Sequence, residues 1–564
     1  MKVIIVGGVA GGASAAARIR RLDENAQIIV FERTSFISYA NCGLPYYVGG
    51  IIQNEEDLTL QTPEGFWDRF RVDVRVRHEV TEIHTEKKTV TVCRLETGKV
   101  YEESYDKLIL SPGAKPTQPN MPGIDNDKIF TLRTVEDTLK IHKFIESEKP
   151  KSATVIGGGF IGIEMAENLA ELGIKVTLAE YANHLLAPFD FDMACIVHSQ
   201  LESHGIRLML NTAVTGFEKN GDSIITKTAG EHNITSDMVL LAIGVIPETE
   251  LAEKAGLELG IKGSIVVNDK METSAPDVYA VGDAVEIKHF VTGKKGLISL
   301  AGPANKQGRI AADNICGGNS VFSGAQGSSV IKLFDMTAAA TGINEFTAKA
   351  AGIDWEAVIL SPASHAGYYP GGKVMTMKVV YDKASLRLLG AQIVGFDGVD
   401  KRIDVLATAI RAGMKATELT ELDLAYAPPY SSAKDPVNMA GFMIENIVSG
   451  KVKQFHYDQV EELSRDGSVT LLDTRTPVEY GRGHVDGFVN IPVDDLRERL
   501  NEIPKDKPVY VMCQSGLRSY LACRILSQNG YECYNFSGGY GFYHIVKSGE
   551  KPSETTYPCG MNKS

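Results

Sequence analysis

The apolar pattern at the start of the chain predicts a strand, a helix and a second strand. Residues Lys2–Val6 form a short apolar run that ends in a glycine-rich turn. A small-residue segment, Ala13–Arg21, follows with helical spacing, and a second apolar run, Ile28–Phe31, ends at Glu32. Because short apolar runs between turns are typical of buried parallel strands, this pattern predicts a β-α-β unit.

The same order recurs later in the chain. The apolar run Ala153–Ile156 meets a second glycine turn, which precedes a helical pattern over Ile163–Leu172. A strand pattern over Val176–Ala179 then ends at Glu180. A glycine turn that opens a helix lets a pyrophosphate approach the helix N-terminus, and the acid accepts hydrogen bonds from ribose hydroxyls. The sequence therefore predicts two dinucleotide sites.

The two turns match the dinucleotide-binding pattern to different degrees. The second turn has the complete G-x-G-x-x-G spacing at Gly157, Gly159 and Gly162. In the first turn, Val9 stands where the second glycine of the pattern belongs. Because that glycine gives the pyrophosphate close access to the backbone, the second unit carries the stronger prediction.

Composition narrows the class of protein. A chain of 564 residues is long enough for several domains, and 43% apolar with 23% charged residues is ordinary for globular protein. The net charge of −13 argues against a nucleic-acid or polybasic membrane surface. We find no apolar stretch of about 18 residues and no secretory signal pattern, so we expect a cytoplasmic protein.

The eight cysteines are scattered and include no C-x-x-C pair. This excludes a zinc knuckle or a paired-cysteine redox centre, predicts no metal site and suits a reducing cytosol. Cys42 stands out, since Pro45 three residues later suits the first turn of a helix. A helix N-terminus favours the thiolate. With no second cysteine nearby, Cys42 must cycle through a mixed disulfide, a persulfide or a sulfenic acid.

Cys513 lies in a different reactive setting. It opens the loop Cys513-Gln514-Ser515-Gly516-Leu517-Arg518, in which cysteine and arginine have C-x4-R spacing. A compact loop of this kind directs backbone N–H groups at one sulfur and stabilises a thiolate or a terminal persulfide, with Arg518 as the fixed cation. The related phosphatase loops have the wider C-x5-R spacing, so the shorter loop favours sulfur.

The segment Ser274–Asp283 ends a strand in Gly-Asp. Together with the two glycine turns, it resembles the two-dinucleotide-binding flavoprotein disulfide reductases over about residues 1–445. The resemblance implies FAD at the first site, with Asp283 on its ribityl chain, and NAD(P)H at the second. Glu180 favours NADH, because an acid there repels a 2′-phosphate, and NADPH stays as the alternative. The dinucleotide-binding residues implied are Gly7, Gly8, Val9, Ala10, Gly11, Gly12, Glu32, Arg33, Gly113, Gly157, Gly159, Gly162, Glu180, Gly282, Asp283 and Ala301.

The Ser38-Tyr39-x-x-Cys42 frame is similar to the single-cysteine branch that contains coenzyme A-disulfide reductases and NADH oxidases and peroxidases. The oxidases and peroxidases carry a histidine in the first glycine turn, where this chain has Ala10, so thiol or persulfide chemistry is favoured. The resemblance implies a basic coenzyme A pocket, although the family has a lysine at the position of Arg71. The pocket residues implied are Ser14, Arg18, Arg21, Ser38, Asn41, Arg71, Asn305 and Arg309.

The same branch implies a homodimer. In coenzyme A-disulfide reductases, two tyrosines of the partner subunit reach the flavin-side cysteine. Tyr368 and Tyr426 are the best matches in this chain, with Tyr430 as an alternate. The active site then needs two copies of the chain.

The C-terminal part resembles a single rhodanese domain. The motifs that carry this resemblance lie around Cys513 and are Leu471–Tyr480, Gly483–Gly487, Asn490–Pro492 and Ser537–Tyr540. The expected fold is therefore α/β, with two doubly wound dinucleotide-binding domains, an α+β dimerisation domain and a C-terminal α/β rhodanese domain. The expected limits are 1–111 and 242–324 (FAD), 112–241 (NAD), 325–445 (dimerisation), 446–454 (linker), 455–552 (rhodanese) and 553–564 (tail).

The expected function is FAD-dependent NADH:persulfide or polysulfide reduction. Cys42 reduces coenzyme A persulfide and related sulfane sulfur at the flavin, sulfide leaves, and Cys513 carries sulfur. Three alternatives stay open at this point. They are a coenzyme A-disulfide reductase, an NADH oxidase or peroxidase, and a sulfur carrier that delivers persulfide to a protein partner.

Overall fold

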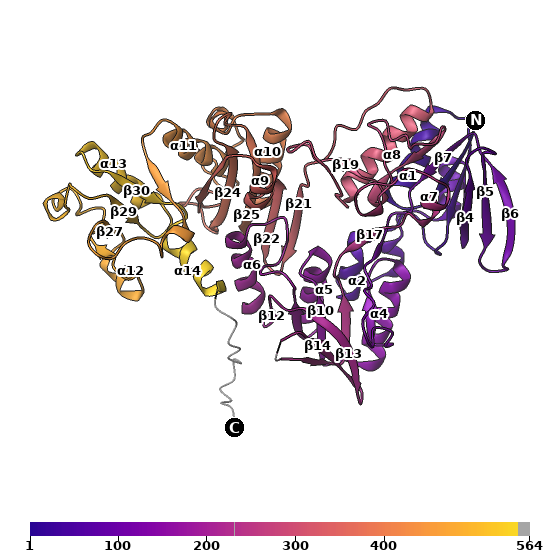
Figure 1. Ribbon diagram of the computed structural model, residues 1–564, viewed down its shortest axis with the longest axis horizontal. Coiled ribbons are helices and arrows are strands. Elements are labelled where there is room, and N and C mark those ends of the chain that lie inside the picture. Colours follow the sequence, from indigo (N-terminus) through magenta and orange to yellow (C-terminus); the bar gives the residue numbers. More distant parts are fainter. Residues whose placement is uncertain (231, 551–564) are drawn as a thin grey trace. The chain divides into compact units, whose positions relative to one another are not determined.

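The computed structural model describes residues 1–230 and 232–550, and the expected tail lies outside them. The chain divides into two compact units (Figure 1). The first comprises Met1–Ala182 and Met209–Gly327, and the second comprises Asn183–Leu208 and the chain from Ser328 onward. No helix of the described residues is long and apolar enough to cross a membrane.

The first predicted β-α-β unit is present as β1 (Lys2–Val6), α1 (Ala10–Leu22) and β2 (Gln27–Glu32). Helix α1 begins three residues earlier than the sequence pattern indicated, inside the glycine turn. The parallel sheet has the strand order β18-β7-β1-β2-β3, with β3 at Val72–Val76, β7 at Lys107–Leu110 and β18 at Val278–Ala280. This domain therefore combines two distant stretches of the chain.

The second β-α-β unit is β10 (Ser152–Ile156), α5 (Phe160–Glu171) and β11 (Lys175–Ala179). Strand β10 pairs in parallel with β11 and with β16 (Met238–Leu241), which pairs in parallel with β9 (Ile129–Thr131). Parallel strands that alternate with helices are the doubly wound arrangement that the sequence predicts.

Shorter elements, two three-stranded antiparallel sheets and two two-stranded ones complete the described part of the first unit. Its other helices are α2 (Leu44–Val48), α3 (Pro63–Phe70), α4 (Val135–Glu148), α7 (Glu250–Lys254) and α8 (Ala301–Ile315). Its other strands are β4 (His78–His84), β5 (Thr89–Arg94), β6 (Lys99–Ser104), β8 (Ala114–Pro116), β13 (Val214–Asn220), β14 (Ser223–Thr228), β15 (Ile234–Ser236), β17 (Val245–Pro247), β19 (Ile287–Lys288) and β20 (Lys295–Gly296). The short strand β12 spans Arg207–Met209.

The second unit begins with an antiparallel sheet of strand order β21-β22-β25-β24-β23. The strands are β21 (Ser329–Leu333), β22 (Met336–Gly342), β23 (Trp355–Leu360), β24 (Met375–Asp382) and β25 (Leu388–Gly395). The helices are α6 (Phe191–Ser203), α9 (Glu345–Ala351), α10 (Val399–Ala412) and α11 (Pro436–Val448).

A buried cation ties α6 to this sheet. The Lys378 ammonium on β24 lies 2.9 Å from Asp192, 3.1 Å from Asp190 and 2.9 Å from Glu345. Burial alone would lower the pKa of Lys378, but the three carboxylates raise it well above its ordinary value. Because removing one partner would leave buried charges unpaired, this cluster fixes residues 183–208 in the second unit.

The C-terminal part forms a parallel sheet of strand order β26-β30-β29-β27-β28. The strands are β26 (Lys453–Phe455), β27 (Thr470–Asp473), β28 (Val489–Asn490), β29 (Val509–Met512) and β30 (Cys533–Phe536), and the helices are α12 (Pro477–Arg482), α13 (Leu517–Gln528) and α14 (Gly539–Glu550).

The connection between the two sheets of this unit is shorter than the predicted linker. Helix α11 continues to Val448 and β26 begins at Lys453, so only residues 449–452 lie between them. The two sheets also contact each other directly. Gln454 Nε2 donates to the Ala357 carbonyl at 2.8 Å, and the Ile359 N–H donates to Ser537 Oγ at 3.1 Å. The other domain limits stay predictions.

Candidate active sites

The first glycine turn is held by a backbone contact and by its acid. Gly7 has a φ of +98°, and a Cβ at Gly12 would overlap the Gly7 carbonyl oxygen. The Gly8 N–H donates to Glu32 Oε2 at 2.9 Å. Val9, which departs from the motif, is the N-cap of α1 and leaves the turn intact. The turn thus presents a helix N-terminus that suits a pyrophosphate.

The second turn repeats this geometry. A Cβ at Gly162 would overlap the Gly157 carbonyl oxygen, and the Gly158 N–H donates to Glu180 Oε2 at 2.5 Å. The turn borders a cavity of about 620 Å³ that is also lined by Tyr181 and residues 241–244. Glycine positions that admit no side chain, an open helix N-terminus and a cavity of this size fit a nucleotide.

The other residues predicted to bind a dinucleotide lie outside the two glycine turns. Asp283 accepts a hydrogen bond from Arg133 Nη2 at 3.0 Å, and the Gly282 N–H donates to Gln307 Oε1 at 2.7 Å. Ala301 begins α8, and Gly113 has a φ of +74°. The Arg33 guanidinium pairs with Glu248, which draws it to the 242–250 segment. The sequence motifs gave no signal for Arg133 or Gln307.

Cys42 lies in a 3-10 turn, Asn41–Gly43, just before α2, with its side chain exposed among the described residues. Partial burial of the Cys42 thiol raises its pKa, and the Glu164 and Asp283 carboxylates raise it further. The Arg133 guanidinium lowers it. These causes oppose the favourable effect on the thiolate that the sequence analysis expects from the helix N-terminus. Helix α2 has only five residues, so its dipole is weak against burial and two acids.

Next to Cys42, an acceptor is available for a ligand. The side-chain oxygen of Asn41 is buried and has no hydrogen-bond partner among the described residues. Because buried polar atoms are almost always paired, this oxygen indicates a group that binds beside the thiol.

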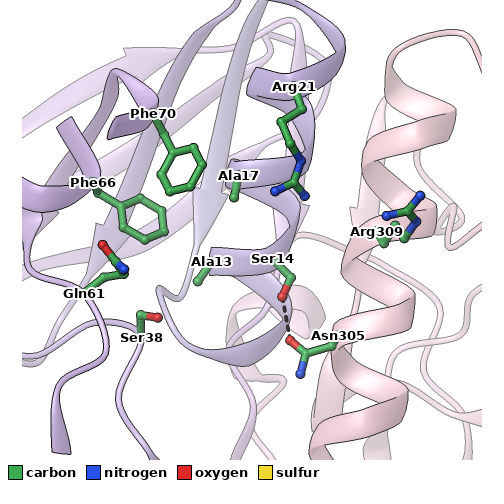
Figure 2. A pocket seen from close by; sticks show the side chains of 10 residues that line it. All are labelled: Ala13, Ser14, Ala17, Arg21, Ser38, Gln61, Phe66, Phe70, Asn305 and Arg309. Carbon is green, nitrogen blue, oxygen red and sulfur yellow. Dashed lines mark hydrogen bonds between the residues drawn. The ribbon is translucent and has the colours of Figure 1, made fainter. Parts of the chain in front are cut away.

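Five of the predicted coenzyme A residues line one cavity of about 380 Å³ (Figure 2). They are Ser14, Arg21, Ser38, Asn305 and Arg309. The Ser14 hydroxyl donates to Asn305 Oδ1 at 2.5 Å and so connects α1 to α8. Gln61, Phe66 and Phe70 also line the cavity, and the sequence patterns gave no reason to choose them.

The cavity is lined by both aromatic and positively charged side chains. The rings of Phe66 and Phe70 lie 5.4 Å apart between centroids, and Figure 2 shows Arg21 and Arg309 on separate helices of the same cavity. Two guanidinium groups and an aromatic wall suit a ligand that has both anionic and aromatic parts.

Three other predicted coenzyme A residues lie outside this lining. Arg18 Nε donates to Asp313 at 2.6 Å, so the shared helix face with Arg21 does not place it in the cavity. Arg71 is the C-cap of α3, where its guanidinium lies 5.6 Å from the centroid of the Trp67 ring. Asn41 lies beside Cys42.

The two predicted tyrosines come together in the second unit. The hydroxyls of Tyr368 and Tyr426 are 2.7 Å apart, and the side chains are 76% and 45% exposed. The alternate, Tyr430, is also exposed. Buried Arg402, which the sequence reasoning missed, donates to the carbonyls of Ser364 and Tyr430 at 2.9 and 3.2 Å. Arg402 therefore holds together the two loops that carry these tyrosines.

Cys513 lies at the end of β29 in a ring of donors. Its side chain is fully buried, the Gly516 N–H donates to Sγ at 3.1 Å, and the Ser519 hydroxyl lies 3.2 Å from Sγ. One backbone N–H of the loop, that of Gly516, thus points at the sulfur, in the way that the sequence analysis expects. Ser519 is an additional contact, on the first turn of α13, that the sequence reasoning missed.

The sequence analysis expects Arg518 to be the fixed cation at the Cys513 sulfur, but the structure gives its guanidinium another partner. Its guanidinium pairs with both carboxylate oxygens of Glu479, at 2.7 and 2.6 Å. This hydrogen bonding is the largest cause that lowers the pKa of Glu479 to about 2. Arg518 is near enough to Cys513 for electrostatic interaction, but its charge is shared with Glu479. The sulfur is therefore surrounded mainly by N–H and hydroxyl donors, and not by a free cation.

Two nucleotide turns, a thiol after the first of them and a sulfur-binding loop define a dinucleotide-dependent oxidoreductase joined to a sulfurtransferase. The family Pyridine nucleotide-disulphide oxidoreductase matches residues 1–308, its dimerisation domain matches 328–436, and Rhodanese-like domain matches 456–543. The chain belongs to the pyridine nucleotide-disulphide oxidoreductases, in the coenzyme A-disulfide reductase and persulfide reductase group with a C-terminal rhodanese domain.

One relative matches the oxidoreductase part of the chain, and two solved structures match nearly its whole length. Coenzyme A disulfide reductase of Staphylococcus aureus (strain JH9) is 38% identical over 442 residues, 78% of this chain and 99% of that protein. The crystal structure of reduced Bacillus anthracis CoADR-RHD matches with a TM-score of 0.95 and 49% identity over 97% of this chain and 98% of that one. A NAD-dependent persulfide reductase from A. fulgidus matches with a TM-score of 0.90 and 39% identity over 96% of this chain and all of that one.

The comparisons confirm the predicted fold class and enzyme class. The protein is a pyridine nucleotide-disulfide oxidoreductase with a rhodanese sulfurtransferase domain, and the family implies FAD and NAD(P)H. The dimerisation domain indicates a homodimer.

Removing the Ser519 hydroxyl tests the donor ring around Cys513. We expect Ser519→Ala to slow sulfur transfer from thiosulfate to cyanide about threefold to tenfold, because a hydrogen bond to a sulfur anion is lost. The control is Ser515→Ala, which alters an exposed hydroxyl of the same loop. Equal rates for wild type and Ser519→Ala would contradict a role for this hydroxyl.

Proposed function

We propose that this protein is an NADH-dependent reductase of persulfides and polysulfides that acts on coenzyme A persulfide and releases sulfide. One arrangement supports the proposal: an exposed thiol, Cys42, follows the first dinucleotide turn, and a second, Cys513, accepts from the Gly516 N–H and lies 3.2 Å from the Ser519 hydroxyl. The similarity to the NAD-dependent persulfide reductase from A. fulgidus supports a persulfide as substrate.

Bound FAD supplies the transfer of two electrons from NADH to sulfur. The Cys42 thiolate attacks the S–S bond of the substrate and becomes a mixed disulfide or a persulfide, while the thiol or sulfide leaves. Two electrons and one proton would then convert a Cys42 persulfide anion, Cys42-S-S⁻, to the Cys42 thiolate and hydrosulfide. Asn41, whose buried oxygen lacks a partner among the described residues, is placed to orient a group bound there.

The cavity of Figure 2 supports coenzyme A as the carrier of the sulfur. Coenzyme A is polyanionic and has an adenine ring, which matches Arg21 and Arg309 on two helices and the Phe66 and Phe70 rings. The Ser14–Asn305 hydrogen bond keeps the two helices together at this site. Tyr368 and Tyr426 of a partner subunit complete the site at Cys42 in this proposal.

Glu180 supports NADH over NADPH. Its two carboxylate oxygens accept hydrogen bonds from the N–H groups of Gly158 and Ala182, which fixes the carboxylate at the end of β11. A 2′-phosphate at this position would be repelled by the carboxylate.

Cys513 takes sulfane sulfur from a polysulfide or a low-molecular-weight persulfide in this proposal. The donors from Gly516 and Ser519 stabilise the terminal sulfur anion. Coenzyme A then shuttles sulfur between Cys513 and Cys42.

Coenzyme A-disulfide reduction is the second candidate. The Staphylococcus aureus relative with that name covers the oxidoreductase part of this chain, and the same cavity serves a coenzyme A disulfide. The rhodanese domain would then have a separate purpose. Ala10 in the first turn, in place of a histidine, disfavours an NADH oxidase or peroxidase.

Two serine variants test the separate roles proposed for Cys42 as the nucleophile and for Cys513 as the sulfur carrier. Cys42→Ser should abolish NADH oxidation with every sulfur substrate, because the nucleophile is lost. Cys513→Ser should reduce coenzyme A persulfide at the wild-type rate but fail with polysulfide. Both are measured as anaerobic NADH oxidation. Equal loss on both substrates in Cys513→Ser would contradict the carrier role.

Arg309→Ala tests the coenzyme A pocket. We expect KM for coenzyme A persulfide to rise about fivefold to tenfold, since one partly solvated phosphate contact is lost. The value of kcat at saturating coenzyme A persulfide should not change, because Arg309 lines the cavity and is not a group that reacts with sulfur. Arg71→Ala is the comparison, because its guanidinium lies against Trp67 outside the cavity. An equal rise in KM in both variants would place the pocket elsewhere.

A further inference from the structure

The arginine of the Cys513 loop is already paired with an acid. Arg518 lies in the first turn of α13, directly before Ser519, whose hydroxyl is 3.2 Å from Cys513 Sγ. Its Nη1 and Nη2 atoms donate to the two carboxylate oxygens of Glu479 at 2.7 and 2.6 Å. A two-point ion pair of this kind fixes the direction as well as the distance of both partners. The positive charge that the C-x4-R spacing brings to the loop is thus balanced by an acid from α12.

Glu479 is held in place by its own helix. Its Oε2 accepts hydrogen bonds from the N–H and the hydroxyl of Thr476, at 2.9 and 2.8 Å. The Glu479 N–H donates in return to the Thr476 hydroxyl at 3.3 Å, which completes a capping box at the start of α12. Since hydrogen bonding from Arg518 lowers the pKa of Glu479 to about 2, the carboxylate is charged at neutral pH. Glu479 is therefore a fixed negative charge beside the loop.

A second arginine next to the loop is paired in the same way. Nη1 of the buried Arg475 lies 3.5 Å from Oε1 of Gln514, the residue after Cys513. Its Nε and Nη2 atoms donate to the Asp473 carboxylate at 3.0 and 2.7 Å. Because each arginine has a carboxylate partner, an anionic ligand would have to compete with that partner for the guanidinium.

Exposed apolar side chains flank the Arg518–Glu479 pair. Val478 directly precedes Glu479, Leu517 directly precedes Arg518, and both side chains are exposed. Leu521, four residues after Leu517 on the same face of α13, is also exposed. Apolar side chains favour contact with an organic chain and offer no hydrogen bond to an oxyanion. The balanced charge and the apolar neighbours are independent features that favour the same class of sulfur donor.

We propose that Glu479 selects the sulfur donor of Cys513: it favours organic persulfides, which bring one charge on the terminal sulfur and an organic chain, over compact dianions such as thiosulfate. Glu479 acts through Arg518, so it is a positioning residue that determines specificity. The inference rests on the proposed role of Cys513 as the acceptor of sulfane sulfur. Of the donors proposed above, it favours the low-molecular-weight persulfide. Specificity of this kind depends on opposing the wrong ligand as well as on binding the right one.

The transfer step balances in atoms and electrons for either donor. The Cys513 thiolate forms a bond to the sulfane sulfur, the bond between that sulfur and the rest of the donor breaks, and its electron pair leaves with the rest of the donor. Thiosulfate leaves as sulfite and an organic persulfide leaves as a thiolate, and a Cys513 persulfide anion forms in both cases. Cyanide then takes the terminal sulfur as thiocyanate and restores the thiolate.

Two donors that differ mainly in charge test the selection. Thiosulfate is a dianion, whereas methanethiosulfonate has a methyl group in place of one oxygen and is a monoanion. Thiocyanate formation by the full-length protein is measured with each donor at low, constant ionic strength. Glu479→Gln should raise the ratio of kcat/KM for thiosulfate to that for methanethiosulfonate about threefold to tenfold, because loss of a negative charge favours a dianion more than a monoanion. A change in the reactivity of Cys513 itself cancels in this ratio.

Glu502→Gln is the matched control. Glu502 makes a two-point ion pair with Arg499, with both contacts at 2.7 Å, elsewhere in the rhodanese part of the chain. This variant should keep the wild-type ratio, and so should Glu479→Asp, which keeps the charge. Transfer from methanethiosulfonate verifies that the loop of each variant is folded. An unchanged ratio in Glu479→Gln, or an equal rise in Glu502→Gln, would overturn the inference.

The double variant Glu479→Gln, Arg518→Gln tests whether the acid acts through the arginine. Its ratio should return to the wild-type value, because the pair is again neutral. A rise that persists in the double variant would overturn the role of Arg518.

Cys513→Ser separates this inference from the proposed function. Thiocyanate formation by Cys513→Ser at the wild-type rate would contradict the role of Cys513 as the sulfur carrier. An inactive Cys513→Ser together with an unchanged donor ratio in Glu479→Gln would overturn only the selection by Glu479.

Discussion

The first unit depends on a close contact at each glycine turn, where the backbone of the turn touches the backbone of another loop. A Cβ at Gly7 would overlap the Ser111 carbonyl oxygen, and one at Gly157 would overlap that of Ala242. Each turn is therefore pressed against the loop that follows a neighbouring strand. This contact directs the next helix N-terminus at the ligand, and the N–H of the following glycine binds the acid that ends the second strand.

The two reactive sulfurs lie in opposite electrostatic settings. Burial and two carboxylates disfavour the thiolate at Cys42, whereas Gly516 and Ser519 direct donors at Cys513. A donor ring of this kind suits storage of a sulfur anion. The exposed position of Cys42 suits an exchange step with a sulfur of the substrate. Each setting therefore fits the role that we propose for its cysteine.

Local features of the fold and site could be predicted from sequence because the chemistry is contained in short segments. The glycine turns and their acids each belong to one β-α-β unit of about 30 residues, and Cys42 and the Cys513 loop each belong to one short loop. The dimerisation and rhodanese domains followed from resemblance, which the family matches confirm.

Contacts between distant segments could not be predicted in this way. Arg18 is drawn to Asp313, 295 residues away, and Arg518 pairs with Glu479, 39 residues away. The spacing of either arginine does not reveal such partners. The same limit applies to the aromatic wall of the cavity, which Phe66 and Phe70 form only once the chain is folded.

The most direct test of the central claim is the ratio of sulfide released to NADH oxidised. The wild-type protein is given coenzyme A persulfide or coenzyme A disulfide in the absence of oxygen, and both products are quantified. We expect faster turnover with the persulfide and one sulfide for each NADH. Preference for the disulfide, with little sulfide released, would contradict the account and identify a thiol-redox enzyme.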